Sequence, residues 1–321
     1  MTWLLATAAI GMAYAVPANA QATRTWVSGF GDDANPCSRT APCKTFQGAL
    51  SKTAAGGEMN CIDAGGYGSV TITKAMTINC YYTLASVLHS GTQGIVINAG
   101  PNDQIVLNGI ETNGAGTTPG TRGISFLAGG TLIVRDSFIY GSQTSPAVGI
   151  SFTPSGVSKL YVERSTVANN GASGTGGGIL IQPTGAGGSA KVEIEDSQVI
   201  NSGGYGLRVD STANTSTAGI SVNIDHSQVS GSTGAGIVAV AVGTNPITMM
   251  IANSVSSNNT TNGIIGNGAQ VTIRVGNTTI TGNATGINPA GGSTISSYGD
   301  NRLDGNTTAN GAFTGAILPK S

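Results

Sequence analysis

Eight short runs with the pattern Gly-apolar-x-apolar, where x is any residue, recur along the chain at intervals of 23 to 30 residues. Gly123-Ile124-Ser125-Phe126 and Gly178-Ile179-Leu180-Ile181 show the pattern. Alternation with a period of two places the apolar side chains on one face of a β-strand, and a repeat of this length is typical of a solenoid. We therefore expect eight stacked strands, which start at Gly94, Gly123, Gly149, Gly178, Gly206, Gly236, Gly263 and Gly286.

A second run, ending in a shared Ser or Thr, follows in six of the repeats. Large apolar residues lie five and three positions before that residue, as Leu160 and Val162 lie before Ser165. The connections are rich in Gly, Asn, Ser and Thr, the period of 3.6 is absent, and two or three strands per repeat are too few for a propeller blade. The pattern predicts an all-β parallel β-helix. The shared residues are Ser137, Ser165, Ser197, Ser227, Ser254 and Thr278.

Composition supports one long, thin domain. The 321 residues include 50 glycines, and only 9% are charged, but 39% are hydrophobic and are placed at period two. Such a chain can bury enough apolar surface to fold, unlike a disordered one of similar glycine content. We expect ten or eleven rungs, where a rung is one complete turn of the solenoid, and inward-facing side chains in the glycine-led strands. Those are Ile124, Phe126, Ile150, Phe152, Ile179, Ile181, Leu207 and Val209.

The first twenty residues have the pattern of a signal peptide. Residues 3–16 are largely apolar and are followed by Ala18-Asn19-Ala20, a small-residue cleavage site, although no basic residue precedes Arg24. The apolar run is too short to span a membrane, and no later stretch qualifies. We expect a secreted protein, extracellular or periplasmic, whose mature chain begins at Gln21.

The four cysteines are expected to form disulfides in an exported protein. Three pairings are possible. Cys37–Cys43 would close a tight loop and Cys61–Cys80 would join neighbouring rungs, so we favour this pair of bonds. Metal binding is the alternative, but the spacing contains no C-x2-C and no histidine lies nearby.

Residues 26–50 carry a resemblance to a known family. They contain Asp33-Ala34-Asn35-Pro36-Cys37 and Pro42-Cys43-Lys44-Thr45-Phe46, followed by Gln47-Gly48-Ala49. This resembles the N-terminal segment of secreted right-handed parallel β-helix proteins of the pectin-lyase-like superfamily, with Cys37 where glycine is usual and Phe46 where isoleucine is usual. The resemblance implies a single-stranded right-handed β-helix with a short capping helix at 45–52. We expect a signal peptide at 1–20, a cap at 21–58, the β-helix at 59–311 and a tail at 312–321.

The motifs of the enzymes in this superfamily are mostly missing. Polygalacturonase-type hydrolases carry Asn-Thr-Asp, Asp-Asp, Gly-His-Gly and Arg-Ile-Lys, of which only Asp32-Asp33 is present, in the cap. Ile224-Asp225-His226 matches a short pectate-lyase-like motif, but the Arg-x-Pro-x-x-Arg of those enzymes is absent. Whether the chain is an enzyme is therefore left open; if it is one, the resemblance implies a polysaccharide lyase or a glycoside hydrolase.

Stacking the second strands in register predicts a column of carboxylates. Glu163, Glu195 and Asp225 lie two residues before the shared serine on successive rungs, next to His226. Like charges at this spacing raise one another's pKa, attract Arg, or bind a hard cation such as Ca²⁺. Neighbouring carboxylates also perform glycoside hydrolysis, so these four residues are the catalytic candidates and the three carboxylates are the metal candidates. The alternative is a solvated face, balanced by nearby Arg and Lys.

Three functions follow from this sequence. The first is a secreted β-helix that interacts with carbohydrate, with a polysaccharide as partner, on an outer strand face. Its weakness is that aromatic residues make up only 5% of the chain. The second is a structural or adhesive cell-surface protein without catalytic activity, and the third is a pectate-lyase-like polysaccharide lyase. A net charge of −1 without a basic stripe argues against nucleic acid as a partner.

Overall fold

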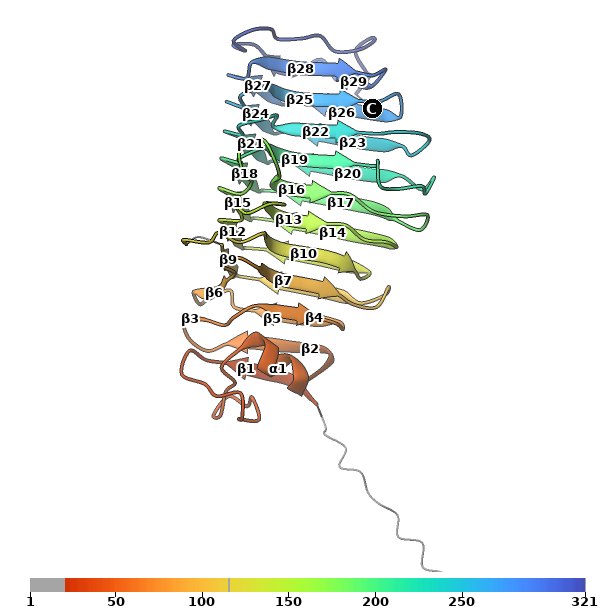
Figure 1. Cartoon of the computed structure of the whole chain (residues 1–321). Coiled ribbons are helices and arrows are strands. Elements are labelled where there is room, and N and C mark those ends of the chain that lie inside the picture. Colours follow the sequence, from red (N-terminus) through yellow and green to blue (C-terminus); the bar gives the residue numbers. More distant parts are fainter. Residues whose placement is uncertain (1–20, 115, 321) are drawn as a thin grey trace, which may run out of the picture.

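The computed structural model describes residues 21–114 and 116–320, which form a right-handed parallel β-helix with one short helix at its N-terminal end (Figure 1). This confirms the predicted fold class. The strands stack in three sheets, which we call A, B and C, and the chain passes from A to B to C within each rung. The signal peptide predicted at 1–20 lies outside the described residues.

Sheet A contains the runs that precede the shared serines. Leu160, for example, pairs with Leu132 on one side and Val192 on the other, so identical faces stack in register. The strands of sheet A are, in spatial order, β1 (Ala22–Val27), β2 (Thr53–Cys61), β5 (Met76–Asn79), β8 (Gln104–Asn108), β11 (Thr131–Arg135), β14 (Val157–Glu163), β17 (Ser189–Glu195), β20 (Ile220–Asp225), β23 (Ile247–Ala252), β26 (Val271–Gly276) and β29 (Thr294–Ser297).

Sheet B follows directly after the shared serines, which form a buried ladder. The backbone N–H of Ser165 donates to Ser197 Oγ at 3.1 Å, and Ser165 Oγ donates to the carbonyl of Glu163 at 2.8 Å. Each hydroxyl thus satisfies backbone groups at a corner where the sheet pattern is interrupted. The strands of sheet B are β3 (Gly65–Gly66), β6 (Ala85–Leu88), β9 (Ile110–Asn113), β12 (Phe138–Tyr140), β15 (Thr166–Ala168), β18 (Gln198–Ile200), β21 (Gln228–Ser230), β24 (Val255–Ser257), β27 (Thr279–Thr281) and β30 (Arg302–Leu303).

Sheet C contains the glycine-led runs, and its predicted inward-facing side chains are all buried. Ile124 pairs with Ile150 and Phe126 with Phe152, whose rings stack with centroids 4.5 Å apart. The strands of sheet C are β4 (Val70–Ile72), β7 (Gln93–Asn98), β10 (Arg122–Ala128), β13 (Val148–Phe152), β16 (Gly177–Ile181), β19 (Tyr205–Asp210), β22 (Ile237–Val240), β25 (Asn262–Asn267) and β28 (Thr285–Ala290).

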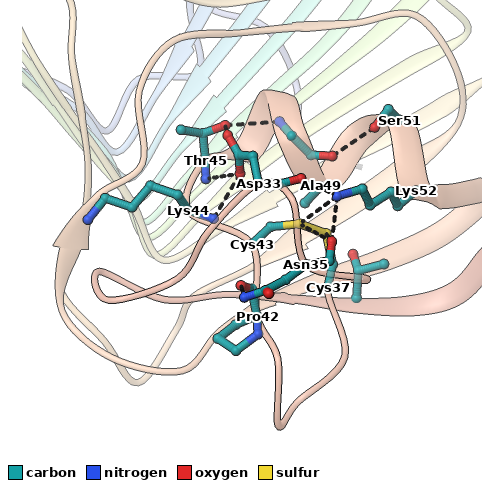
Figure 2. Close-up of a disulfide and its surroundings, with 12 residues drawn as sticks. Asp33, Asn35, Cys37, Pro42, Cys43, Lys44, Thr45, Ala49, Ser51 and Lys52 are labelled. Atoms are coloured by element: carbon teal, nitrogen blue, oxygen red, sulfur yellow. Dashed lines mark hydrogen bonds between the residues drawn. A yellow bond between two sulfur atoms is a disulfide. The ribbon is translucent and has the colours of Figure 1, made fainter.

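A helix and a disulfide close the N-terminal end (Figure 2). Helix α1 (Phe46–Lys52) begins after Thr45, whose side chain accepts a hydrogen bond from the N–H of Gly48, as an N-cap does. Its buried side chains Phe46, Ala49 and Leu50 cover the first rungs. Covering the end of a β-helix protects it from edge-to-edge association.

Both predicted disulfides are present. Cys37–Cys43 lies beside α1, and Cys61–Cys80 joins the end of β2 to the residue after β5, on the neighbouring rung. Disulfides persist in oxidising compartments, so they favour an extracytoplasmic location for the folded domain.

Candidate functional site

The corner between sheets A and B carries polar side chains in a vertical column. After each strand of sheet A from β11 to β26, one residue adopts the left-handed conformation, with φ between 43° and 50°, and the chain then enters sheet B. Few side chains other than Asn, Asp and Gly adopt this conformation readily. The column consists of Asp136, Arg164, Asp196, His226, Asn253 and Asn277.

A cleft of about 400 Å³ opens at this corner, where two rungs differ in the length of their connection. Residues 80–84 link β5 to β6, whereas Gly109 alone links β8 to β9. Gly109 has a φ of 68°, and a Cβ there would lie 2.4 Å from the Cα of Tyr81. The longer connection therefore rests on the glycine and protrudes beside the shorter corners. The cleft is lined by residues that include Tyr81, Leu84, Glu111, Asp136, Phe138 and Arg164.

Aromatic rings form the apolar part of the cleft. Tyr81 is 49% exposed and Phe138 is 40% exposed. Each ring is supported by a second one: Tyr82 packs edge-on against Tyr81 at 4.9 Å, and Tyr140 stacks on Phe138 at 4.6 Å between centroids. Aromatic surface that is gathered in one place and left exposed commonly marks a binding site.

Two fixed polar groups accompany the rings. The guanidinium of Arg164 donates from Nε and Nη2 to the two carboxylate oxygens of Asp136, each at 2.9 Å. The hydroxyl of Tyr140 donates to Glu111 Oε1 at 2.9 Å, and burial together with this hydrogen bond raises the pKa of Tyr140 to about 12. An apolar cleft with a few oriented polar groups has the general make-up of a ligand-binding site.

The predicted carboxylate column is present in register. Glu163 pairs with Glu195, and Glu195 pairs with Asp225, along β14, β17 and β20. Oε2 of Glu163 lies 3.8 Å from Nη1 of Arg164, and Oδ2 of Asp225 lies 3.0 Å from Nδ1 of the largely exposed His226. Among the described residues, the side chain of Glu195 has no hydrogen bond or ion pair, and it is exposed.

The carboxylate column of Glu163, Glu195 and Asp225 does not form a preassembled metal centre. Within residues 21–114 and 116–320, no three His, Cys, Asp or Glu side chains are gathered so that they could hold a metal ion. Binding of Ca²⁺ at Glu163, Glu195 and Asp225, and a catalytic role for them or for His226, stay predictions. Arg164 links the carboxylate column to the cleft, because it lines the cleft and lies near Glu163.

The cleft itself was missed by the sequence reasoning. Phe138 falls between the shared Ser137 and the inward Ile139, and its position in the alternation marks it as outward-facing. The outward position of Phe138 could therefore be predicted from the sequence. The protrusion of residues 80–84 could not be predicted, because it depends on which neighbouring rung has the shorter connection.

The structure adds one negative observation. In the described part of the chain, no helix is both long enough and apolar enough to cross a bilayer.

Comparisons with known proteins agree with the fold. The family described as right handed beta helix region matches residues 56–222, a little over half of the chain. A pectate lyase, Pel9A, superposes with a TM-score of 0.63 at 14% identity over 87% of this chain and 76% of the lyase. At this level of identity the likeness concerns the fold alone.

Two further structures are less similar. The Dettilon tailspike protein gives a TM-score of 0.46 at 11% identity, over 82% of this chain and 63% of the tailspike. A GH136 lacto-N-biosidase from Eubacterium ramulus gives 0.42 at 12% identity, over 90% of this chain and 66% of the enzyme. No curated protein matches the sequence significantly. Because the family match covers more than half of the chain and agrees with its repeats and its three-sheet solenoid, the chain belongs to the right-handed β-helix family.

Proposed function

We propose that this is an exported β-helix protein that binds carbohydrate in the cleft at the corner between sheets A and B. The observation that carries the proposal is the pairing of exposed rings, Tyr81 and Phe138, with the bidentate Arg164–Asp136 pair. The C–H faces of a sugar ring pack against aromatic rings, and its hydroxyl groups bind charged and amide groups. The cleft offers both kinds of contact within one opening.

Binding is favoured over catalysis by the state of the two carboxylates in the cleft. Asp136 holds the guanidinium of Arg164, and Glu111 accepts a hydrogen bond from Tyr140. Glycoside hydrolysis needs one carboxyl group as an acid and a second as a base or nucleophile. Here both carboxylates already serve to position neighbouring side chains.

Export is part of the proposal. It is supported by the signal-like pattern of residues 1–20 in the sequence and by the two disulfides of the folded domain. N-terminal sequencing of the protein secreted by its native host would test it, with Gln21 as the expected first residue.

The proposal is tested by screening the mature protein on an array of neutral and acidic glycans and titrating the best ligand by calorimetry. Phe138→Ala should weaken binding roughly tenfold or more, which corresponds to about 1.4 kcal/mol. Arg164→Lys should also weaken it, because lysine cannot make the bidentate pair. Tyr161→Ala, on the outer face of sheet A, is the matched aromatic control and should bind like the parent.

An array without any bound glycan would reject carbohydrate binding and leave the structural or adhesive alternative. Cleavage of a bound polysaccharide, detected as new chain ends, would show instead that the cleft is catalytic.

A further inference from the structure

The first positions of four neighbouring strands of sheet C hold an arginine at one end and a tyrosine at the other. In register, they are Arg122 (β10), Val148 (β13), Gly177 (β16) and Tyr205 (β19). A Cβ at Gly177 would lie 2.6 Å from Cε2 of the Tyr205 ring. The ring therefore lies over the start of β16, on the side of β10, and glycine at position 177 leaves room for it.

Arg122 is a half-buried cation without a counter-ion. Among the described residues its guanidinium has no ion pair and no hydrogen bond, although its Nε is shielded from solvent. Burial lowers the pKa of Arg122. A guanidinium has five N–H donors, so even a hydrogen bond to the unpartnered Oε1 of Gln93, beside it in register, would leave the charge uncompensated. Because removing a charge from water is costly unless the charge is paired, an anion at this guanidinium is favourable.

Tyr205 supplies a neutral hydrogen-bond donor near this cation. Burial raises the pKa of the phenol to about 12, and the charges of Arg208 and Arg122 oppose that rise. The hydroxyl group therefore keeps its proton at neutral pH, and both guanidinium groups act on it. Within residues 21–114 and 116–320 it has no hydrogen-bond partner, so its proton can be donated to a ligand.

Arg208, on the same strand as Tyr205, already has its counter-ion. Its Cζ lies 6.0 Å from the centroid of the Tyr205 ring, and its Nε and Nη2 donate to Oδ2 of Asp210 at 2.9 Å and 2.6 Å. Asp210 is buried, and its Oδ1 accepts hydrogen bonds from the N–H and the hydroxyl of Thr212. The group thus contains two cations and one anion, and the unpaired charge is that of Arg122.

We propose that Arg122 and the hydroxyl of Tyr205 bind a sulfate or phosphate group at the start of the sheet C strands. The planar fork of a guanidinium donates two parallel hydrogen bonds to two oxygens of an oxyanion. A carboxylate has no further oxygen, whereas a tetrahedral oxyanion offers a third one to the tyrosine. The site belongs to a different corner from the cleft, so it does not depend on the proposed function.

The test is calorimetric titration of the mature protein, at constant ionic strength, with inorganic phosphate, inorganic sulfate, glucose 6-phosphate and acetate. We expect the tetrahedral ions to bind roughly tenfold more tightly than acetate. Arg122→Gln should abolish their binding, and Tyr205→Phe should weaken it. Arg274→Gln, which removes a half-buried arginine on the outer face of sheet A, is the matched control and should bind like the parent. Tighter binding of glucose 6-phosphate than of free phosphate would support a group carried by a sugar, and the reverse order would support the free ion.

Thermal melts separate ion binding from packing. If Arg122 binds the ion, the rise in melting temperature that phosphate gives the parent is lost in Arg122→Gln and retained in Arg274→Gln. If Arg122 only packs against its neighbours, Arg122→Gln shifts the melting temperature equally in phosphate and in chloride, which overturns the proposal. The absence of phosphate and sulfate binding to the parent overturns it too, and so does equal affinity of the parent and Tyr205→Phe. Phe138→Ala, in the cleft, should bind phosphate like the parent, so the two proposals fail separately.

Discussion

The chain bends at the two corners on either side of sheet B, and the residues at the two bends differ in kind. At the corner between B and C, glycine stands at the start of the sheet C strand on eight successive rungs. At the corner between A and B, the left-handed position holds Asp, Arg, His and Asn on neighbouring rungs. The glycine position at the first corner excludes every side chain, whereas the left-handed position at the second accepts many. The side chain at this position can therefore differ from rung to rung only at the second corner, where the cleft also lies.

The glycine column is set by space and not by backbone conformation. None of these eight glycines, all of which are described, has a positive φ. A Cβ at Gly178 would lie 2.4 Å from Cγ1 of Val199 and 2.7 Å from the carbonyl oxygen of Gly206 on the next rung. The close approach of sheets B and C at this corner thus leaves no room for even a methyl group.

The largest effect is expected from adding that methyl group. Gly178→Ala should lower the free energy of unfolding by about 1–3 kcal/mol, because overpacking shifts the backbone or the buried Val199. Urea denaturation followed by circular dichroism measures the change. Gly156→Ala is the control, since a Cβ there meets nothing within 4 Å. Equal stability of the two variants would show that the corner is loosely packed.

The contrast between the corners also explains what the sequence could predict. Gly178, Ile181 and Ser165 belong to stacked positions that need, on every rung, a residue without a side chain, a buried apolar residue and a hydroxyl group, respectively. The same residue type therefore recurs many times in one sequence. The disulfides were predictable because adjacent rungs bring Cys61 and Cys80 together. The cleft depends on a mismatch between two particular rungs, at Tyr81 and Gly109, and periodicity cannot indicate a feature that occurs only where it is broken.

His89 offers a smaller, pH-dependent way to probe the corner between B and C. It follows β6 and is fully buried, with Nε2 3.1 Å from Ser142 Oγ. Burial lowers the pKa of its imidazole. The unfolded chain therefore binds a proton below about pH 6.5, while the folded protein does not. Stability should consequently fall as the pH drops below 6.5, until the lowered pKa of the folded state is reached.

Thermal melts between about pH 7.5 and pH 5 measure this effect. His89→Gln should flatten the part of the profile near pH 6, whereas His226→Gln, at the exposed corner, should retain the parent's fall. A parent profile that coincides with that of His89→Gln would mean that the ring is accessible to protons in the folded state.

The smallest effect is expected at the corner between A and B, in the carboxylate column. Glu195 lies between Glu163 and Asp225 in register and has no partner among the described residues. Like charges directly opposite on paired strands are destabilising, so Glu195→Gln should raise the free energy of unfolding by roughly 0.5 kcal/mol in low salt. Glu193→Gln, on the same strand but with the uncharged Tyr161 and Asn223 beside it in register, is the control and should give no comparable gain.

The same stability measurement, repeated in Ca²⁺, tests whether the carboxylate column binds a cation. If the three carboxylates bind Ca²⁺, millimolar Ca²⁺ stabilises the parent by RT ln(1 + [Ca²⁺]/Kd), and Glu195→Gln loses that gain. If they form a solvated face, Ca²⁺ acts only by screening, and the variant stays slightly more stable than the parent in both buffers. The order of the melting temperatures of the parent and Glu195→Gln in Ca²⁺ therefore distinguishes a cation site from a charged surface. A cation site would mean that the corner between A and B binds ligands at several rungs, and a charged surface would leave the cleft as its binding site.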